Sequence, residues 1–214
     1  MSDWWHWPWV LENTGLIAER LGEHLQLTGL AVVLGLAIAF PLALAALRWP
    51  RLHPALLGVT GVAFTIPALA LFILLVPFTG LSVTTALIGL TLYTLLILFR
   101  NIITGLQGVP AEVRESATAM GYGAGRRLWR VELPLALPTI IAGIRIATVT
   151  TIGLVTVTAL IGQGGLGQLF ITGFTLQFPM PLIVGFTLSI ALAVLVDLLL
   201  VGAERMLTPW QRRT

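Results

Sequence analysis

Five long apolar runs constrain this chain more than any other feature of its sequence. A helix of roughly 20 apolar residues crosses a hydrocarbon core about 30 Å thick, and only helices and closed barrels satisfy their backbone hydrogen bonds there. The sequence therefore predicts an all-α integral membrane protein with about five transmembrane helices. We place these spans at about residues 25–47, 55–76, 84–98, 138–161 and 182–203, where the third has room to begin earlier.

Composition agrees with a membrane chain and leaves no room for a separate soluble domain. Hydrophobic residues make up 57% of the 214 residues and charged residues 10%, whereas soluble domains carry about 25% charged residues. We therefore expect one transmembrane domain over residues 1–214. Pro41 and Pro67 fall inside predicted spans, where we expect kinks rather than helix ends, because neighbouring helices can satisfy the freed carbonyl groups.

Several residue types that support chemistry are missing or scattered. The chain has no cysteine and no lysine, so a disulfide, a thiolate metal site and a P-loop for nucleotide are all excluded. His6, His24 and His53 are too widely separated to suggest a metal site, and no basic patch interleaved with aromatic residues indicates nucleic-acid binding. We expect a protein that is not an enzyme, holds no metal or nucleotide, and binds no nucleic acid.

The arginines predict the orientation of the chain in the membrane. With the amino terminus outside, five spans place ten of the 12 arginines in cytoplasmic segments and one outside, with Arg145 left within a span. This asymmetry follows the positive-inside rule. We therefore expect a multi-pass protein of the cell membrane with residues 1–24 outside or at the outer interface, residues 105–135 in the cytoplasm, and a cytoplasmic carboxyl terminus. The ten are Arg48, Arg51, Arg100, Arg114, Arg126, Arg127, Arg130, Arg205, Arg212 and Arg213, and the outer one is Arg20.

Four tryptophans open the chain, at Trp4, Trp5, Trp7 and Trp9. Tryptophan prefers the headgroup layer of a membrane, so we expect these residues to anchor a surface helix over about residues 10–23. An aromatic cage for a cationic ligand is the alternative, because tryptophan rings attract quaternary ammonium groups. Adjacent tryptophans at a terminus are poorly preorganised for such a cage, so the anchor is the favoured interpretation.

The one organised polar segment, residues 109–138, separates the third and fourth spans. Pro110 suits the first turn of a helix, Glu112 complements its positive end and Gly121 suits a left-handed terminating position. These signals predict a helix over about residues 110–120. A helix this short is marginal alone in water, so we expect a partner to hold it.

The residues within and after this helix indicate how it is used. A turn at 122–125 leads into a second, basic helix at 126–133, and Pro134 leads back into the membrane. The first helix has too few large apolar residues to bury itself. Its small side chains permit close approach to a groove, and a methionine supplies an adaptable contact. These contact residues are Ser116, Ala117, Ala119 and Met120.

The spacing of this segment resembles the EAA loop of ABC importer permeases. That pattern reads Glu-Ala-Ala, three residues, Gly, nine residues, Ile, one residue, Leu-Pro, and here Ser116 stands for alanine and Val131 for isoleucine. The resemblance implies a type I ABC importer transmembrane domain whose short helix is a coupling helix, seated in a cleft of a separate ATPase subunit that holds ATP and Mg. The implied coupling residues are Glu115, Ser116, Ala117, Met120, Gly121, Leu133 and Pro134.

Four further segments are similar to the osmoprotectant branch of these permeases, which serves glycine betaine, choline and carnitine. They are residues 65–71, 93–101, 133–145 and 159–167, and the likeness covers nearly the whole chain after residue 25. The resemblance implies a second permease subunit, identical or related, ATPase subunits and a substrate-binding protein, assembled in a lipid bilayer. A methionine or other small-solute permease of the same fold, an ion-coupled secondary transporter or channel, and a structural assembly subunit are the alternatives.

One glycine motif invites a different interpretation. Residues 162–167 satisfy the dinucleotide fingerprint G-x-G-x-x-G, but no predicted strand precedes them and no acidic residue follows at about 20 residues. We therefore reject nucleotide binding and place the motif at the outer end of the fourth span. Glycines there permit a sharp turn and close helix approach, which suits an outer gate or a docking rim for the binding protein. The candidate residues are Gly162, Gly164, Gly165 and Gly167.

Two charges lie inside predicted spans. Arg145 and Asp197 sit at equal depth, about 10 Å from the cytoplasmic ends of the fourth and fifth spans at about 1.5 Å per residue, which predicts an ion pair. The alternative is that Arg145 snorkels to the interface. No line of ionisable residues crosses the membrane midplane, so a proton-driven carrier is disfavoured.

Polar and kink-forming residues in spans give candidate positions for the translocation pathway, because such residues tend to face a cavity. These are Thr65, Pro67, Tyr93 and Asn101. Ordinary packing between helices is the alternative for each of them.

Overall fold

The computed structural model describes residues 6–210, which form helices joined by short connections, without a β-strand among them. The first half contains α1 (Trp7–Glu12), α2 (Thr14–Arg48), α3 (Leu52–Thr65), α4 (Ala68–Thr79) and α5 (Val83–Gln107). The second half contains α6 (Ala111–Ala119), α7 (Ala124–Arg127), the π-helical turn η1 (Leu128–Glu132), α8 (Leu133–Thr158), the 3-10 turn η2 (Ala159–Ile161), α9 (Gly167–Thr175) and α10 (Pro179–Leu207). The predicted all-α fold is confirmed.

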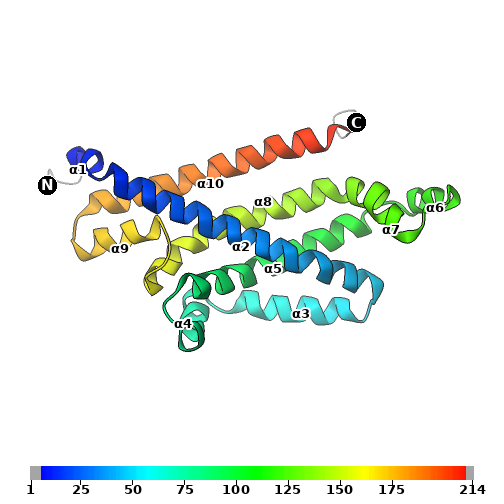
Figure 1. Ribbon diagram of the computed structural model, residues 1–214, viewed down its shortest axis with the longest axis horizontal. Coiled ribbons are helices and arrows are strands. Elements are labelled where there is room, and N and C mark those ends of the chain that lie inside the picture. Colours follow the sequence, from blue (N-terminus) through cyan, green and yellow to red (C-terminus); the bar gives the residue numbers. More distant parts are fainter. Residues whose placement is uncertain (1–5, 211–214) are drawn as a thin grey trace.

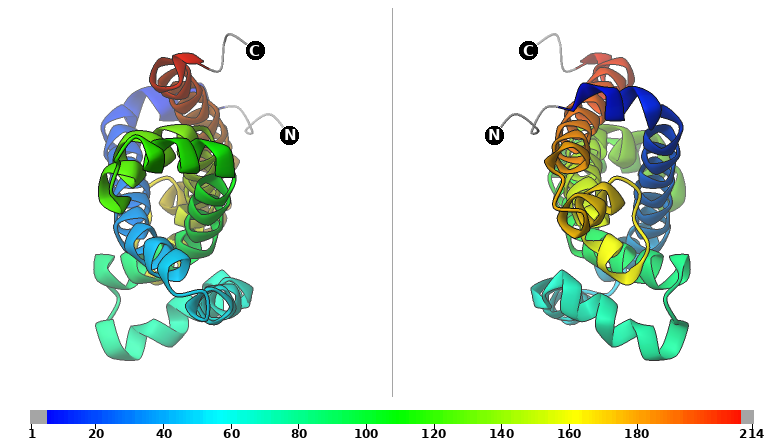
Figure 2. Two further views of the ribbon diagram at one scale, coloured as in Figure 1. Left: turned by 90° about the vertical axis from the view of Figure 1, so that its right-hand side faces the viewer. Right: turned by 90° about the vertical axis from the view of Figure 1, so that its left-hand side faces the viewer.

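The long helices run side by side along the longest axis of the molecule (Figure 1). Views from the two ends show α2, α5, α8 and α10 grouped together, with α3 and α4 lying to one side (Figure 2). α6 and α7 lie at one end, together with the last turns of α10 and the connection between α2 and α3. α1 and α9 lie at the opposite end (Figure 1). We call these the α6 end and the α9 end.

Four helical segments of residues 6–210 are long and apolar enough to cross a membrane, namely α2, α5, α10 and the continuous helix over residues 124–161. α3 and α4 together meet the same test, although the chain bends by 98° between them. Counting this bent pair as one gives five spans, as the sequence predicts. An odd number of spans agrees with the placement of α1 and the end of α10 at opposite ends of the bundle (Figure 1).

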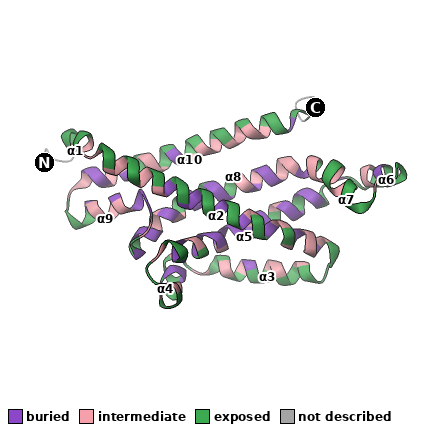
Figure 3. Cartoon of the chain, viewed as in Figure 1, coloured by how far each residue is buried: buried purple, intermediate pink, exposed green. Residues whose placement is uncertain are grey.

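α5 is the centre of the bundle, because it packs against α2 and against α8. Its side chains Leu98, Phe99 and Ile102 have no exposed surface, and neither do Ala39 and Ala43 on α2. Small side chains on α2 let the two helices approach closely. α10 is far more exposed along its length (Figure 3). α5 and α8 therefore form the packed centre of the bundle, and α6 follows the end of α5.

The predicted separate surface helix over residues 10–23 is wrong. α1 is short, and α2 then runs without a break from Thr14 into the first span. His24 explains this continuity, because its side chain is fully buried and its Nε2 lies 3.0 Å from the carbonyl oxygen of Ile152 on α8. That contact keeps the start of α2 against the bundle. Two of the predicted membrane anchors lie outside the described residues, Trp4 and Trp5.

The prediction that Pro67 only kinks the second span is also wrong. α3 ends at Thr65, and α4 begins after Pro67 in a new direction. A residue before proline is driven out of the helical region, and Ile66 accordingly has a ψ of 128°. The Tyr93 hydroxyl on α5 donates a hydrogen bond to the Ile66 carbonyl oxygen, which satisfies a backbone group that the break sets free. Pro41, in contrast, stays inside α2.

Two further parts differ from the expectation. The basic helix predicted at 126–133 is not separate, because α7, η1 and α8 form one continuous helix. Pro134 has no N–H to donate, and the chain passes this point through a π turn, in which the Leu133 N–H bonds to the Leu128 carbonyl oxygen. The glycine motif predicts a turn at residues 162–167, and no helix is predicted between that turn and the last span, where α9 lies. A helix of 9 residues is too short to be recognised as a span.

Candidate functional site: the exposed α6 segment

The carboxyl end of α6 closes with a pair of backbone hydrogen bonds. The Tyr122 N–H bonds to the Ala117 carbonyl oxygen at 3.1 Å. The Gly121 N–H bonds to the Thr118 carbonyl oxygen at 2.9 Å. This pair forms a Schellman motif, which needs a left-handed residue, and Gly121 has a φ of 82°. The predicted helix end at Gly121 is therefore confirmed, and glycine is required there because a Cβ atom would add strain.

Two arginines tie α6 to its neighbouring helices. Arg114, within α6, donates to the carbonyl oxygen of Leu106 near the end of α5. Arg127 on α7 donates from Nη1 to the Thr118 hydroxyl at 2.9 Å. Its Nε also donates to Glu132 at 2.6 Å. These bonds involve charged donors and are stronger than neutral ones, so they hold α6 in place without covering its outer face.

The predicted coupling residues divide between the two faces of this segment. Ala117 is buried, and α6 packs against α7 and η1. Glu115, Ser116 and Met120 are exposed, Met120 to 69% of its full surface. The outer face therefore presents a carboxylate, a hydroxyl and a flexible thioether, a mixture that suits contact with a protein groove. The two remaining coupling residues, partly buried at the start of α8, are Leu133 and Pro134.

Three of the four predicted pathway residues meet at the break between α3 and α4. Thr65 and Pro67 flank the break, and Tyr93 reaches it from α5. The Phe64 ring lies edge-on to the Tyr93 ring, with centroids 5.7 Å apart. Asn101 lies about two turns further along α5 and packs against α8. The structure therefore does not bring all four residues to one place.

Residues 162–167, which we call the glycine segment, connect η2 at the end of α8 to α9. Gly162, Gly164 and Gly165 all have positive φ values. A Cβ atom on Gly165 would lie only 2.5 Å from the Arg20 carbonyl oxygen on α2, so the two backbones touch. Gly167 is buried at the start of α9. The segment thus makes the sharp turn and the close helix contact that the sequence predicts, and its role as a gate or docking rim stays a prediction.

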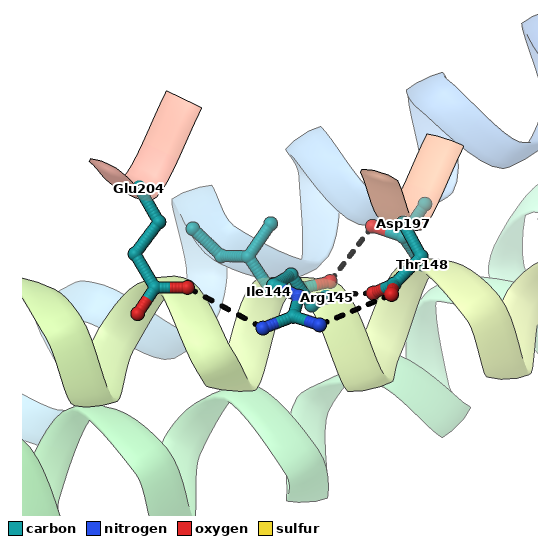
Figure 4. A network of polar contacts seen from close by, with 5 residues as sticks. All are labelled: Ile144, Arg145, Thr148, Asp197 and Glu204. Carbon is teal, nitrogen blue, oxygen red and sulfur yellow. Dashed lines mark hydrogen bonds and ion pairs between the residues drawn. The ribbon is translucent and has the colours of Figure 1, made fainter. Parts of the chain in front are cut away.

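Arg145 and Asp197 lie together, as the equal depth of the two residues predicts. The Arg145 guanidinium donates two hydrogen bonds to the Asp197 carboxylate, at 2.9 and 3.0 Å, between α8 and α10. Figure 4 shows this guanidinium between Asp197 and a second carboxylate, Glu204, at 3.4 Å. The sequence analysis missed Glu204, although it follows Asp197 by two helical turns and so shares one face of α10. The network connects the exposed α10 to α8.

A metal or dinucleotide site is not found in the described part of the chain. Within residues 6–210, no group of three or more His, Asp or Glu side chains could hold a metal ion. The glycine segment follows a helix rather than a strand. It therefore lacks the strand–turn–helix context through which this motif binds a pyrophosphate.

Comparison with known proteins decides the family. Residues 31–212 match the family described as "Binding-protein-dependent transport system inner membrane component". The chain belongs to this family. It is therefore a multi-pass membrane permease of ABC importers, and the α6 segment occupies the position between spans at which the resemblance to the EAA loop places a coupling helix.

Characterised permeases resemble this one over nearly their full length. It is 36% identical over 197 residues to the glycine betaine/carnitine/choline transport system permease protein OpuCB of Bacillus subtilis, which covers 92% of this chain and 91% of the relative. It is 37% identical over 206 residues to the osmoprotectant import permease protein OsmW of Salmonella typhimurium, covering 94% and 96%. The resemblance to the osmoprotectant branch is confirmed.

A solved structure shows the same fold. The permease superposes on a chain of the MetNI methionine ABC transporter in an inward-facing conformation with a TM-score of 0.81, covering 92% of this chain and 98% of the other. The two sequences are 20% identical, so the likeness is one of fold. The predicted type I ABC importer architecture is confirmed.

Proposed function

We propose that this permease imports glycine betaine, choline, carnitine or a related quaternary ammonium osmoprotectant as one subunit of an ATP-driven transporter. The observation that carries the substrate class is the pair of relatives at 36% and 37% identity, whose names specify these solutes or osmoprotectants. The methionine transporter chain is 20% identical. That likeness supports the fold and does not favour methionine as the substrate.

The exposed α6 segment supports coupling to a separate ATPase subunit. Glu115, Ser116 and Met120 lie on the outer face of a helix that Arg114 and Arg127 brace from its inner side. A braced helix with a free outer face can pass the movement of a partner to the bundle, because rigid elements carry coupling between sites. In this arrangement ATP and Mg bind the ATPase subunits, and the permease itself is not catalytic.

The same proposal orients the permease and completes its assembly. The α6 end and the carboxyl terminus are cytoplasmic, and the amino terminus is outside, as the arginine distribution favours.

A second permease subunit, identical or related, encloses the translocation pathway together with this one. The solute crosses the membrane by alternating access. The break at Thr65 and Pro67 contributes to that pathway. A substrate-binding protein delivers the solute at the α9 end, where the outer gate or docking rim comprises Gly162, Gly164, Gly165 and Gly167.

Uptake by the assembled complex tests this proposal. The permease is reconstituted with its ATPase and binding-protein partners in proteoliposomes, and uptake of labelled glycine betaine, choline, carnitine and methionine is measured with and without ATP. We expect ATP-dependent uptake of at least one quaternary ammonium solute and none of methionine. Uptake of methionine alone would refute the substrate class. Uptake by the permease without the ATPase, driven by an ion gradient, would refute the ATP-driven mechanism.

A further inference from the structure

A pocket of about 450 Å³ lies between the end of α2 and the α6 segment. The ends of α5, α7 and η1 complete its walls, and its volume falls within the range of about 300 to 1,000 Å³ that is usual for small-ligand sites. None of its charged residues is among the predicted coupling residues, pathway residues or glycines of the gate or docking rim, although Arg114 and Arg127 also brace α6. These charged residues are Arg48, Arg114, Arg127 and Glu132.

The pocket carries positive charge that the described residues do not neutralise. Glu132 pairs with Arg127, whereas Arg48 and Arg114 form no ion pair within residues 6–210. Arg114 donates to the Leu106 carbonyl oxygen, but its Nε is buried and has no hydrogen-bond partner in the described part of the chain. A buried donor without an acceptor is costly. An anionic group in the pocket would balance the charge of Arg48 and Arg114.

Leucines form the apolar side of the pocket, at the level where the first span ends. Leu44 and Leu47 lie in the last turns of α2, directly before Arg48, and Leu128 lines the pocket from η1. α2 changes here from apolar to basic, which marks the boundary between hydrocarbon and headgroups. The pocket therefore places arginines beside leucines at the end of the first span, where we expect the lipid headgroups.

We propose that this pocket binds the phosphate group of an anionic phospholipid, with the arginines at the headgroup and the leucines against the first part of the acyl chains. Guanidinium groups recognise phosphate through paired, charge-assisted hydrogen bonds. Basic pockets between spans at the membrane surface bind anionic headgroups. A soluble phosphate shares the polar part of this chemistry but makes no use of the leucines, so the phospholipid is the better match.

A phospholipid bound in the pocket also helps to hold α6 in place. Arg48 belongs to α2, Arg114 to α6 and Arg127 to α7, so three segments contribute a positive charge to the wall of this one pocket. Arg114 and Arg127 are also the residues that hold α6 in place. The bound lipid therefore adds support to α6 on its inner side. This role is independent of which solute is transported.

Lipid retention by the assembled transporter tests the site. The complex of the permease with its ATPase subunits is placed in nanodiscs of phosphatidylcholine and phosphatidylglycerol in equal amounts and then extracted, and native mass spectrometry counts the phosphatidylglycerol that remains bound. Arg48→Gln is the first variant, because the Arg48 side chain makes no hydrogen bond within residues 6–210 and its loss leaves the fold intact. We expect about fivefold less retained phosphatidylglycerol, the effect of removing one arginine from an anionic headgroup. The double variant Arg48→Gln/Arg114→Gln should lose more.

Arg51→Gln is the matched control. Arg51 is exposed, carries the same charge, lies three residues from Arg48 and does not line the pocket. We expect its retention of phosphatidylglycerol to stay close to that of the parent complex. Equal losses in Arg48→Gln and Arg51→Gln would show a diffuse surface attraction and overturn the proposal. Unchanged retention in Arg48→Gln would overturn it as well.

Two further results would assign the pocket to a different occupant. If added inorganic phosphate removes the retained lipid from the parent complex, the site takes a soluble phosphate, and the phospholipid assignment is wrong. If Arg48→Gln releases the ATPase subunits while lipid retention is unchanged, an acidic group of the ATPase fills the pocket, which also refutes the assignment. Retention that is lost in Arg48→Gln, kept in Arg51→Gln and insensitive to inorganic phosphate supports the phospholipid.

Discussion

The two ends of the bundle each contain a glycine with positive φ, and these two glycines have opposite surroundings. At the α9 end, a Cβ atom on Gly165 would lie 2.5 Å from the Arg20 carbonyl oxygen and 2.6 Å from the His24 backbone nitrogen. At the α6 end, a Cβ atom on Gly121 would meet no heavy atom within 4 Å. One turn is therefore shaped by packing against another helix, and the other by its own backbone hydrogen bonds.

This difference separates a part of the permease that depends on contact between helices from a part that is held by local bonds. The α9 end holds its shape only if α2, α8 and the glycine segment stay in contact, so substitutions there act on stability. The α6 end is held by Arg114 and Arg127 and by local hydrogen bonds, and its outer face contacts nothing in the described chain. Substitutions on that face should change coupling while the bundle stays folded.

The largest expected effect is that of Gly165→Ala. The added Cβ atom collides with the α2 backbone, and the residue has a φ of 44° that disfavours any side chain. Overpacking and left-handed strain together should cost about 3 kcal/mol or more. We expect a clear fall in the thermal unfolding temperature of the purified permease, measured in detergent.

Gly162→Ala is the control for this prediction. Gly162 also has a positive φ, 78°, but no heavy atom lies within 4 Å of its added Cβ. Only the backbone strain of about 1 kcal/mol should remain. If the two variants unfold at the same temperature, the close contact between the glycine segment and α2 does not contribute to stability, and the contrast between the two ends fails.

The spans could be predicted from the sequence because each depends on one local property, the length of an apolar run. α10 extends from Pro179 to Leu207, close to the predicted 182–203. The ends of helices are harder to predict from the sequence. α5 continues to Gln107, well past the predicted 98, because α8 packs along that stretch and Asn101 donates to the carbonyl oxygen one turn before it.

The contacts that shape the site could not be predicted, because they join residues with no periodic relation in the sequence. Tyr93 satisfies the carbonyl group of Ile66, 27 residues away, so the break at Pro67 depends on a neighbouring helix. Arg127 and Glu132 are five residues apart and meet across a π turn, whereas an α-helix brings together residues three or four apart. The coupling motif could be recognised from the sequence because all of its residues lie within one short segment, residues 115–134.

Gly121→Ala should lower the stability of the permease less than Gly165→Ala does, and its main effect should be on coupling to the ATPase. The left-handed conformation of Gly121 closes α6, and an alanine there should cost about 1 to 2 kcal/mol, confined to this segment. We expect the unfolding temperature of the bundle to change little and ATP-driven uptake to fall. Gly123→Ala is the control, because Gly123 has a φ of −66° and open space around it. Normal uptake by Gly121→Ala would contradict a role for this helix end in coupling.

Arg127→Gln should loosen α6 without changing its sequence. The substitution removes the bonds to Thr118 and Glu132, which should cost about 1 kcal/mol at this partly exposed site. We expect the backbone amides of α6 to exchange hydrogen about fivefold faster, as measured by mass spectrometry. Arg130→Gln, an exposed arginine on the same segment, should leave the exchange unchanged. Equal protection of α6 in both variants would show that Arg127 does not brace it.

The smallest expected effect on stability belongs to Glu115→Ala, because Glu115 is exposed on the outer face of α6. A surface substitution of this kind should change the free energy of unfolding by less than about 0.5 kcal/mol. Its effect on transport should be large, about tenfold or more, if the side chain is a central contact with the ATPase subunit. Glu112→Ala removes the same charge from the first turn of the same helix and should preserve most of the uptake. Parallel losses of uptake in both variants would show that α6 needs only negative charge, and an unimpaired Glu115→Ala would show that its outer face is not where the motor is coupled.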